Sequence, residues 1–250
     1  GTLINGVGSF GIRVIDSSLS VDDTELSGIN RPSGAQSFES DGTAIYVEQA
    51  TEEILVSNTN ISNGSFVGLW IEGPGVTVTD SSFANFAYGV YHPGDAASAA
   101  GRHTTVTGST FLDLANEAIL TFASATIAGN TVGTKKLVPD ALASPDVAGI
   151  RVVAPGGTVA VTNNTIDTVG QRGIGIYGSN SDGKVETATV EGNVLTNIIG
   201  GNGIDVHHVI SAGIVDNTVT GVDHAYFDDD GGPNAGATVN GYGIDCFNST

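Results

Sequence analysis

The stretch Val161-Thr-Asn-Asn-Thr-Ile166 is one copy of a six-residue phrase that occurs eight times in this 250-residue chain. Each copy begins with Val or Ile and ends with a large apolar residue. The copies start at Val21, Val56, Val78, Val106, Ile127, Val161, Val190 and Ile214. Their spacings run from 21 to 35 residues. A unit that recurs at a minimum spacing, with insertions of variable length, is typical of a solenoid.

A second phrase of four residues alternates with the first. It begins with a small residue, its second and fourth positions are mostly aliphatic, and its third position is variable. Its copies start at Gly11, Ala44, Gly68, Gly89, Ala118, Gly149, Gly173, Gly203 and Gly243. The alternation predicts a strand with one buried face. The leading glycine suits a positive φ or a close backbone approach. We therefore expect at least two short strands per coil, paired in parallel with the next coil about 4.8 Å away.

The fourth position of the first phrase is polar in every copy. From the first copy to the last it is Thr24, Thr59, Ser81, Ser109, Asn130, Asn164, Asn193 and Asn217. Asparagine tolerates the left-handed conformation, and its amide can donate to one neighbouring coil while accepting from the other. This register predicts an internal ladder of hydrogen-bonded Asn, Ser and Thr side chains.

With both phrases in place, the chain resembles the right-handed parallel β-helix proteins of the pectate-lyase-like superfamily. The resemblance covers nearly all 250 residues and implies an all-β solenoid of about nine coils. We expect residues 1–250 to form a single domain, as a segment of a longer protein or a filament. The fold is shared by polysaccharide lyases, hydrolases and epimerases, phage tailspikes, autotransporter passengers and surface proteins. Function must therefore be argued from side chains.

The composition excludes several partners. Acidic residues outnumber basic ones by 27 to 8, which gives a net charge of −19. Such a surface repels phosphate backbones and anionic lipids, so we expect neither nucleic-acid binding nor membrane insertion. High acidity with only three lysines favours an extracellular or cell-surface location. The single cysteine, Cys246, occupies an inward position of the second phrase and is expected to be buried.

Insertions fall at two points of the repeat. Residues 27–42, 133–147 and 220–241 follow the first phrase, whereas residues 93–104 and 179–187 follow the second. Loops that leave the coil at two fixed corners would flank one flat sheet and form a groove, where repeat proteins often bind ligands. Simple tolerance of insertions at surface corners explains the same pattern.

The variable third position of the second phrase should form a column on the outer face of that sheet. Tyr46, Trp70 and Tyr91 occupy it on consecutive coils, and Arg151 occupies it further along. An exposed aromatic strip of this kind can stack on sugar rings or contact a protein partner. Packing of the rings beneath the neighbouring loops is the alternative.

The same column ends in acidic residues that suggest chemistry. Asp205 and Asp245 should lie on adjacent coils, with His207 on the same face. A close carboxylate pair has one raised pKa and could serve glycoside hydrolysis or hold Ca²⁺. His207 could supply a base near neutral pH. These three residues are the catalytic candidates.

A comparison of motifs weakens the catalytic interpretation. Gly203-Ile-Asp-Val-His207 resembles the Tyr-Gly-Phe-Asp-Pro-His motif of alginate C5-epimerases, and Tyr242-Gly-Ile-Asp245 resembles its first half. The proline is missing from both, and the second copy lacks the histidine. The catalytic set of polygalacturonases is absent from the sequence.

The insertion at residues 220–241 carries a run of carboxylates. Asp223, Asp228, Asp229 and Asp230 lie close in sequence, and no lysine or arginine follows Lys184. Hard oxygen ligands favour Ca²⁺ over softer metals, so we expect these residues to bind calcium if they bind a metal. No cofactor is otherwise required.

Two functions stand open at this point. The first is an extracellular structural or adhesive β-helix, a stalk, passenger, matrix or surface-layer segment, that contacts a polysaccharide or another surface protein and associates end to end. The second is a polysaccharide lyase, C5-epimerase or glycoside hydrolase working in an Asp/His groove. Ragged ends and the scarcity of basic residues favour the first, whereas a convergent acid–base cluster would favour the second.

Overall fold

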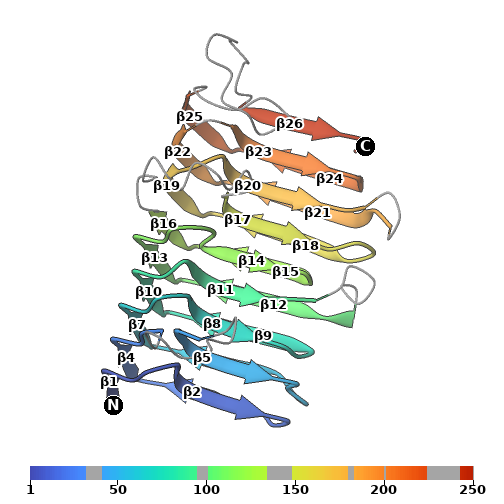
Figure 1. Ribbon diagram of the computed structural model, residues 1–250. Helices are drawn as coiled ribbons and strands as arrows, with labels where there is room; N and C mark the ends of the chain where they lie inside the picture. Colours follow the sequence, from blue (N-terminus) through green and yellow to red (C-terminus); the bar gives the residue numbers. More distant parts are fainter. Residues whose placement is uncertain are drawn as a thin grey trace.

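The computed structural model describes residues 1–31, 41–94, 101–133, 148–179, 183–199, 201–223 and 243–249. In this part of the chain every regular element is a strand, and the strands stack coil upon coil (Figure 1). Each complete coil contributes three strands, one to each of three parallel sheets. The architecture is therefore the expected all-β parallel helix, with three faces where the sequence had predicted at least two strands per coil.

Sheet 1 opens each coil and receives the second half of the six-residue phrase. Its strands, in order, are β1 (Thr2–Asn5), β4 (Thr24–Ser27), β7 (Asn60–Ser62), β10 (Ser82–Ala84), β13 (Thr110–Leu112), β16 (Thr131–Gly133), β19 (Thr165–Val169), β22 (Val194–Ile199) and β25 (Thr218–Asp223).

Sheet 2 contains the second phrase. Its strands are β2 (Phe10–Ile15), β5 (Thr43–Glu48), β8 (Val67–Ile71), β11 (Tyr88–His92), β14 (Ile119–Thr121), β17 (Ala148–Val153), β20 (Arg172–Tyr177), β23 (Asn202–His207) and β26 (Ile244–Phe247).

Sheet 3 ends each coil with the first residues of the six-residue phrase. Its strands are β3 (Ser20–Asp22), β6 (Ile54–Ser57), β9 (Gly75–Thr79), β12 (His103–Thr107), β15 (Ser124–Ala128), β18 (Thr158–Thr162), β21 (Val185–Glu191) and β24 (Val209–Val215).

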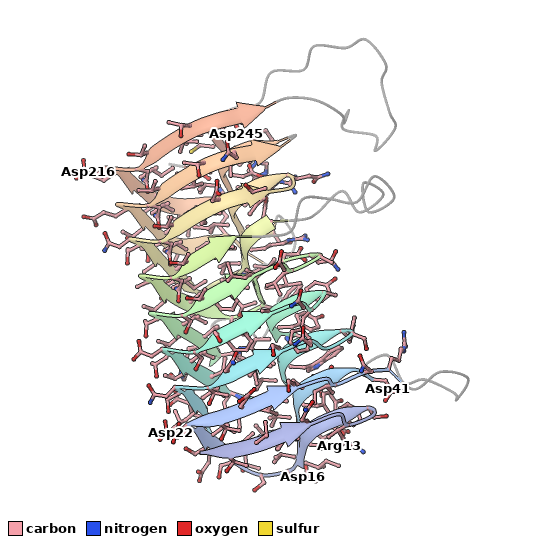
Figure 2. All side chains as sticks on the ribbon, turned by 90° about the vertical axis from the view of Figure 1, so that its left-hand side faces the viewer. Arg13, Asp16, Asp22, Asp41, Asp216 and Asp245 are labelled. Carbon is pink, nitrogen blue, oxygen red and sulfur yellow. The ribbon has the colours of Figure 1, made fainter. Side chains whose placement is uncertain are left out.

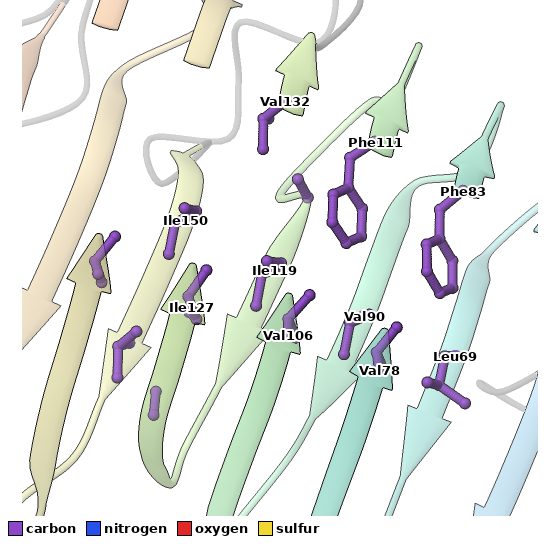
Figure 3. Close-up of a cluster of buried hydrophobic side chains, with 14 of the residues drawn as sticks. Leu69, Val78, Phe83, Val90, Val106, Phe111, Ile119, Ile127, Val132 and Ile150 are labelled. Carbon is purple, nitrogen blue, oxygen red and sulfur yellow. The ribbon is translucent and has the colours of Figure 1, made fainter. Parts of the chain in front are cut away.

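The core runs along the axis and is built from the aliphatic anchors of both phrases. Phe83 and Phe111 stack with ring centroids 5.1 Å apart and face the aliphatic side chains of sheets 2 and 3 (Figure 3). Both phenylalanines are fully buried. The anchors of each coil pack against one another across the axis and against the anchors of the coils above and below, so part of the hydrophobic contribution depends on stacking.

The polar ladder lies inside the corner between sheets 3 and 1, and the predicted register is confirmed from Thr59 to Asn217. Asn164 Nδ2 donates to Asn193 Oδ1 at 2.9 Å, and Asn164 Oδ1 accepts from Asn130 Nδ2 at 2.9 Å. The same Nδ2 also donates to the Ile127 carbonyl at 3.0 Å. Backbone N–H groups donate along the column as well, for instance Asn164 N–H to Asn193 Oδ1 at 2.9 Å. The amides thus satisfy backbone groups that the turn leaves unpaired.

The left-handed residue of this corner is one position earlier than expected. Position three of the phrase has positive φ in all eight copies, whereas the ladder residue at position four does not. The position-three residues are Asp23, Asn58, Asp80, Gly108, Gly129, Asn163, Gly192 and Asp216. All are Asp, Asn or Gly, the types that adopt this conformation most easily. At position four, Asn, Ser or Thr is instead required because its side chain forms hydrogen bonds.

The leading glycine of the second phrase serves close packing. A Cβ at Gly89 would lie 2.5 Å from the Ala118 carbonyl oxygen of the next coil, and at Gly173 it would lie 2.7 Å from that of Gly203. Neither glycine has positive φ. The close approach of backbones is therefore confirmed as the role of these glycines, and the positive φ is not.

Two further sequence expectations meet the structure here. Cys246 is exposed, which corrects the expected buried thiol. It pairs in register with the fully buried Val206, but no described strand stacks on its other side. No helix among the described residues is long and apolar enough to cross a membrane.

Candidate functional site

The outer face of sheet 2 brings the predicted site residues into one column. Strand pairing aligns the third positions of the second phrase across all nine coils. In order they are Arg13, Tyr46, Trp70, Tyr91, Leu120, Arg151, Gly175, Asp205 and Asp245. The column is therefore confirmed, and it places aromatic residues near one end and acidic residues near the other. Figure 2 labels Arg13 and Asp245 at these two ends.

Both edges of this sheet carry the insertions. Segments 28–42, 134–147 and 224–243 join sheet 1 to sheet 2, whereas segments 93–102 and 178–184 join sheet 2 to sheet 3. The two predicted corners are thus confirmed.

Six aromatic rings form a continuous set of contacts on the first four coils, which we call the aromatic band. Its members are Phe10, Tyr46, Phe66, Trp70, Tyr88 and Tyr91. Trp70 is central, since its ring centroid lies 4.8 Å from that of Tyr91 and 5.8 Å from that of Tyr46. Both of these Trp70 pairs are edge-to-face contacts, which add to the stabilisation from burial.

Exposure within the band is uneven. Trp70 and Tyr91 are half-buried, but Tyr46 is only 9% exposed, because the Phe10 ring stacks on it at 5.1 Å. The expected strip of three exposed rings is therefore reduced to two, with Tyr46 as their support. Burial, with the nearby Glu117 carboxylate, raises the pKa of Tyr91 above its ordinary value. Its hydroxyl thus stays a hydrogen-bond donor at neutral pH.

Carboxylates and one arginine border the aromatic band. Trp70 Nε1 donates to Glu72 Oε1 at 3.2 Å. Arg13 pairs with Glu48 at 3.0 Å, and its guanidinium carbon lies 5.8 Å from the Tyr46 ring centroid. Polar groups that accept and donate hydrogen bonds therefore surround a flat apolar centre, the usual composition of a binding surface.

A second cluster, the acid–base cluster, centres on Asp205 and consists of Arg172, Tyr177, Asp205, His207 and Asp245. The Asp205 side chain is 1% exposed. Its Oδ2 accepts from the Tyr177 hydroxyl at 2.6 Å and lies 2.7 Å from Arg172 Nε. Burial, followed by the Asp205 charge, raises the pKa of Tyr177 far above its ordinary value. Tyr177 and Arg172 therefore hold Oδ2 of Asp205 in place as donors.

The other oxygen of Asp205 has a different environment. Asp205 Oδ1 lies 2.7 Å from His207 Nε2, and that nitrogen lies 3.7 Å from Asp245 Oδ2. Oδ1 and Nε2 are both buried, yet their alignment is not that of a hydrogen bond and neither has another hydrogen-bond partner. The predicted trio of Asp205, His207 and Asp245 thus converges, with two polar atoms left unsatisfied at its centre.

Arg151 was predicted with the aromatic residues but lies beside the acid–base cluster. Its guanidinium carbon lies 5.7 Å from the Tyr177 ring centroid, and its Nη1 lies 3.7 Å from the buried Glu117 carboxylate. Arg172 approaches the same tyrosine ring at 5.8 Å. Tyr177 is therefore flanked by two guanidinium groups.

Several residues in or beside the two clusters were not predicted from the sequence. Phe10, Tyr88, Glu117 and Arg172 each stand directly before the small residue that opens the second phrase. Strand pairing shows that this is a second column, since Phe10 lies opposite Thr43 and Arg172 opposite Asn202. The signal was present in the repeat alignment but not in the alternation used to find the first column.

The proposed calcium ligands cannot be placed. Asp228, Asp229 and Asp230 lie outside the described residues. For Asp223 the structure describes only its place at the end of β25. The calcium prediction therefore stays a prediction.

Comparison with known proteins identified a matching family. The family described as "Right handed beta helix region" matches residues 2–219. Searches of the curated proteins and of the solved structures each found no match. The match covers most of the chain and carries no activity with it.

Proposed function

Because the chain belongs to the right-handed β-helix family, we propose that it is an extracellular structural or adhesive protein that binds carbohydrate along the outer face of sheet 2. The aromatic band is the observation that carries this proposal. The core of these coils is already filled by their inward-facing aliphatic anchors. The six contacting rings on the outer face are therefore not needed to form the core. A half-exposed Trp70 beside Tyr91 offers a flat surface for a sugar ring.

The repeat geometry supports an extended ligand. Ring-bearing positions recur with the strand spacing of about 4.8 Å, so a chain lying along the solenoid axis meets one ring after another. The carboxylates of Glu48 and Glu72 can accept hydrogen bonds from sugar hydroxyls beside the rings. A polysaccharide of several units would therefore bind more tightly than a single sugar.

The charge selects the kind of polysaccharide. The chain carries a net charge of −19, and the arginines Arg13, Arg151 and Arg172 of sheet 2 are each already paired with a carboxylate. A polyuronate would meet repulsion on this face, where these three arginines are already engaged by carboxylates. We therefore propose a neutral glycan as the ligand.

The experiment uses Trp70, the single tryptophan of the chain, as its own reporter. Purified protein is titrated with neutral and acidic oligosaccharides of increasing length while tryptophan fluorescence is recorded. Neutral oligosaccharides should change the Trp70 emission at saturating concentrations, and Tyr91→Ala should weaken binding about tenfold, the effect of roughly 1.4 kcal/mol of lost stacking. Leu55→Ala, at an exposed apolar residue of sheet 3, is the matched control and should bind normally.

Two results would overturn the proposal. An unchanged emission across the whole panel would contradict carbohydrate contact at Trp70. Equal affinity of wild type and Tyr91→Ala for a ligand that does change the emission would place the binding surface elsewhere.

The acid–base cluster favours a second candidate, a polysaccharide-active enzyme. The observation behind it is the convergence of Asp205, His207, Asp245, Arg172 and Tyr177 on one outer face. Since Asp205 is 1% exposed, its role in such an enzyme would be to orient His207 rather than to contact the substrate. His207 and Asp245, at 29% and 37% exposure, would be the groups that reach it.

Product analysis separates the two candidates. An enzyme should release shorter or unsaturated sugars, or change the epimer content of the polymer, and His207→Gln should abolish that change. A binding protein should leave every polysaccharide chemically unaltered while retaining the Trp70 response.

A further inference from the structure

We propose that Asp205, His207 and Asp245 form a binding site for a divalent transition metal of the zinc type. This site lies on the last two described coils and is separate from the aromatic band on which the proposed function rests. Its three potential ligand atoms, Asp205 Oδ1, His207 Nε2 and a carboxylate oxygen of Asp245, all lie within 4.8 Å of one another.

The unsatisfied atoms point to a ligand. Asp205 Oδ1 and His207 Nε2 are buried, face one another at 2.7 Å and make no hydrogen bond. A buried carboxylate oxygen that accepts no hydrogen bond loses its solvation without full compensation. A metal ion bound to both atoms would satisfy them together, and it would not require the hydrogen-bond alignment that they lack.

The distances fit a tetrahedral ion. Zinc lies about 2.0–2.2 Å from carboxylate oxygen and imidazole nitrogen, so two of its ligand atoms lie about 3.4 Å apart. The distances from His207 Nε2 to Asp205 Oδ1 and to Asp245 Oδ2, 2.7 and 3.7 Å, bracket that value. Small side-chain shifts would complete the geometry, with water in the remaining position.

The neighbouring residues provide the support that metal ligands need. Tyr177 and Arg172 hold Asp205 by its other oxygen, so Oδ1 remains directed at His207. Asn202 Nδ2 lies 3.5 Å from Asp245 Oδ2. Such second contacts orient ligands and commonly change metal affinity by 10–100-fold. With His207 neutral, the two carboxylates and Arg172 sum to −1, which favours a divalent cation.

The imidazole determines the class of metal. Ca²⁺ and Mg²⁺ take oxygen ligands, whereas imidazole nitrogen suits zinc and its neighbours among the transition metals. Because Asp205 and His207 belong to β23 and Asp245 to β26, the ion would also link these two coils.

The test titrates the chelator-treated 250-residue chain with Zn²⁺ by calorimetry and with Co²⁺ by visible absorption. Wild type should bind one equivalent of Zn²⁺ and show the ligand-field bands of tetrahedral Co²⁺. Asp245→Asn and His207→Gln should each weaken binding by more than about 100-fold, beyond the usual second-contact effect. His103→Gln is the matched control, because His103 also lies beside a carboxylate, Glu53 at 3.3 Å, on another sheet.

A further measurement uses only the wild-type protein, so its result does not depend on whether the variants fold. Co²⁺ should shift the ring NMR signals of His207 in the wild type and leave those of His92 and His103 unchanged. Absence of Zn²⁺ binding by wild type, retention of affinity within threefold in both variants, or equal binding of Ca²⁺ that His207→Gln does not affect would each overturn the site.

Discussion

At the corner between sheets 3 and 1, the left-handed backbone conformation explains which residue types occupy position three of the six-residue phrase. Position three of the phrase has φ between 46° and 65° in every copy and is always Asp, Asn or Gly. Figure 2 labels Asp22 and Asp216, which lie along this edge in the first and last copies. The penalty for a Cβ in this conformation, about 1–2 kcal/mol, recurs with each coil.

Gly129 offers a direct test of that penalty. Its φ is 65°, and a Cβ built on it meets nothing within 4 Å, so only conformation is at stake. Gly129→Val should lower the free energy of unfolding by about 1–2 kcal/mol or more, whereas Gly129→Asn should change it by less than about 1 kcal/mol. Urea unfolding measures both. Equal losses in the two variants would show that steric crowding, and not φ, governs the position.

His92 is a second residue whose environment makes a prediction. It is fully buried, its Nε2–H donates to the Gly73 carbonyl at 3.0 Å, and its Nδ1 accepts from Thr104 at 2.8 Å. Burial, followed by the charge of Arg102, lowers the pKa of His92 from 6.5 to about 4. The histidine is therefore neutral in the folded protein at pH values where it is charged in the unfolded chain.

The pH dependence of stability follows from that difference. Between pH 6.5 and about 4 the unfolded state binds a proton that the folded state does not. The contribution of neutral His92 is complete above pH 6.5 and is lost as the pH falls towards 4, by about 3 kcal/mol in total. His92→Gln should flatten the free energy of unfolding over this window relative to wild type, and exposed His103→Gln should not. Parallel pH curves for wild type and His92→Gln would contradict the assignment.

At the scale of the element, each short strand depends on its neighbours above and below. Sheet 1 strands such as β10 and β13 are three residues long and would be unstable alone. The ladder at their entrance satisfies backbone groups that no sheet bond reaches. The ladder therefore stabilises the stacking of one coil on the next, and its role is not limited to the turn in which it lies.

Asn164 tests the ladder. Replacing it with Leu removes the four hydrogen bonds of the Asn164 side chain. The backbone N–H of Asn130 and the carbonyl of Ile127 each lose this side chain as a partner. The free energy of unfolding should fall by about 1–3 kcal/mol. Asn164→Ser should cost less, because Ser81 and Ser109 fill the same position and still accept from the preceding backbone N–H. Equal losses would assign the effect to packing rather than to hydrogen bonds.

At the scale of the whole molecule, charge is the dominant feature. A net charge of −19 on 250 residues destabilises the compact state through repulsion between like charges, and salt screens this repulsion. The melting temperature should therefore rise between low salt and 1 M NaCl, in a thermal scan followed by circular dichroism. A melting temperature that falls on adding NaCl would contradict the role of repulsion.

The calcium prediction is tested in the same experiment. Millimolar Ca²⁺ at matched ionic strength should raise the melting temperature beyond the effect of NaCl, and Asp228→Asn with Asp230→Asn should remove the extra rise. If NaCl reproduces the whole gain, residues 223–230 do not bind calcium specifically.

The sequence by itself determined the solenoid, the ladder register, the outer column and the corners that carry insertions. These features repeat, and a repeat displays the same local requirement many times. Tertiary structure alone decided how far each side chain is covered. Tyr46 is buried because Phe10 stacks on it, Cys246 is exposed because no described strand covers it, and Asp205 is enclosed by Arg172 and Tyr177. Such contacts join side chains of different columns and different coils, so they cannot be predicted from the residue pattern within one phrase.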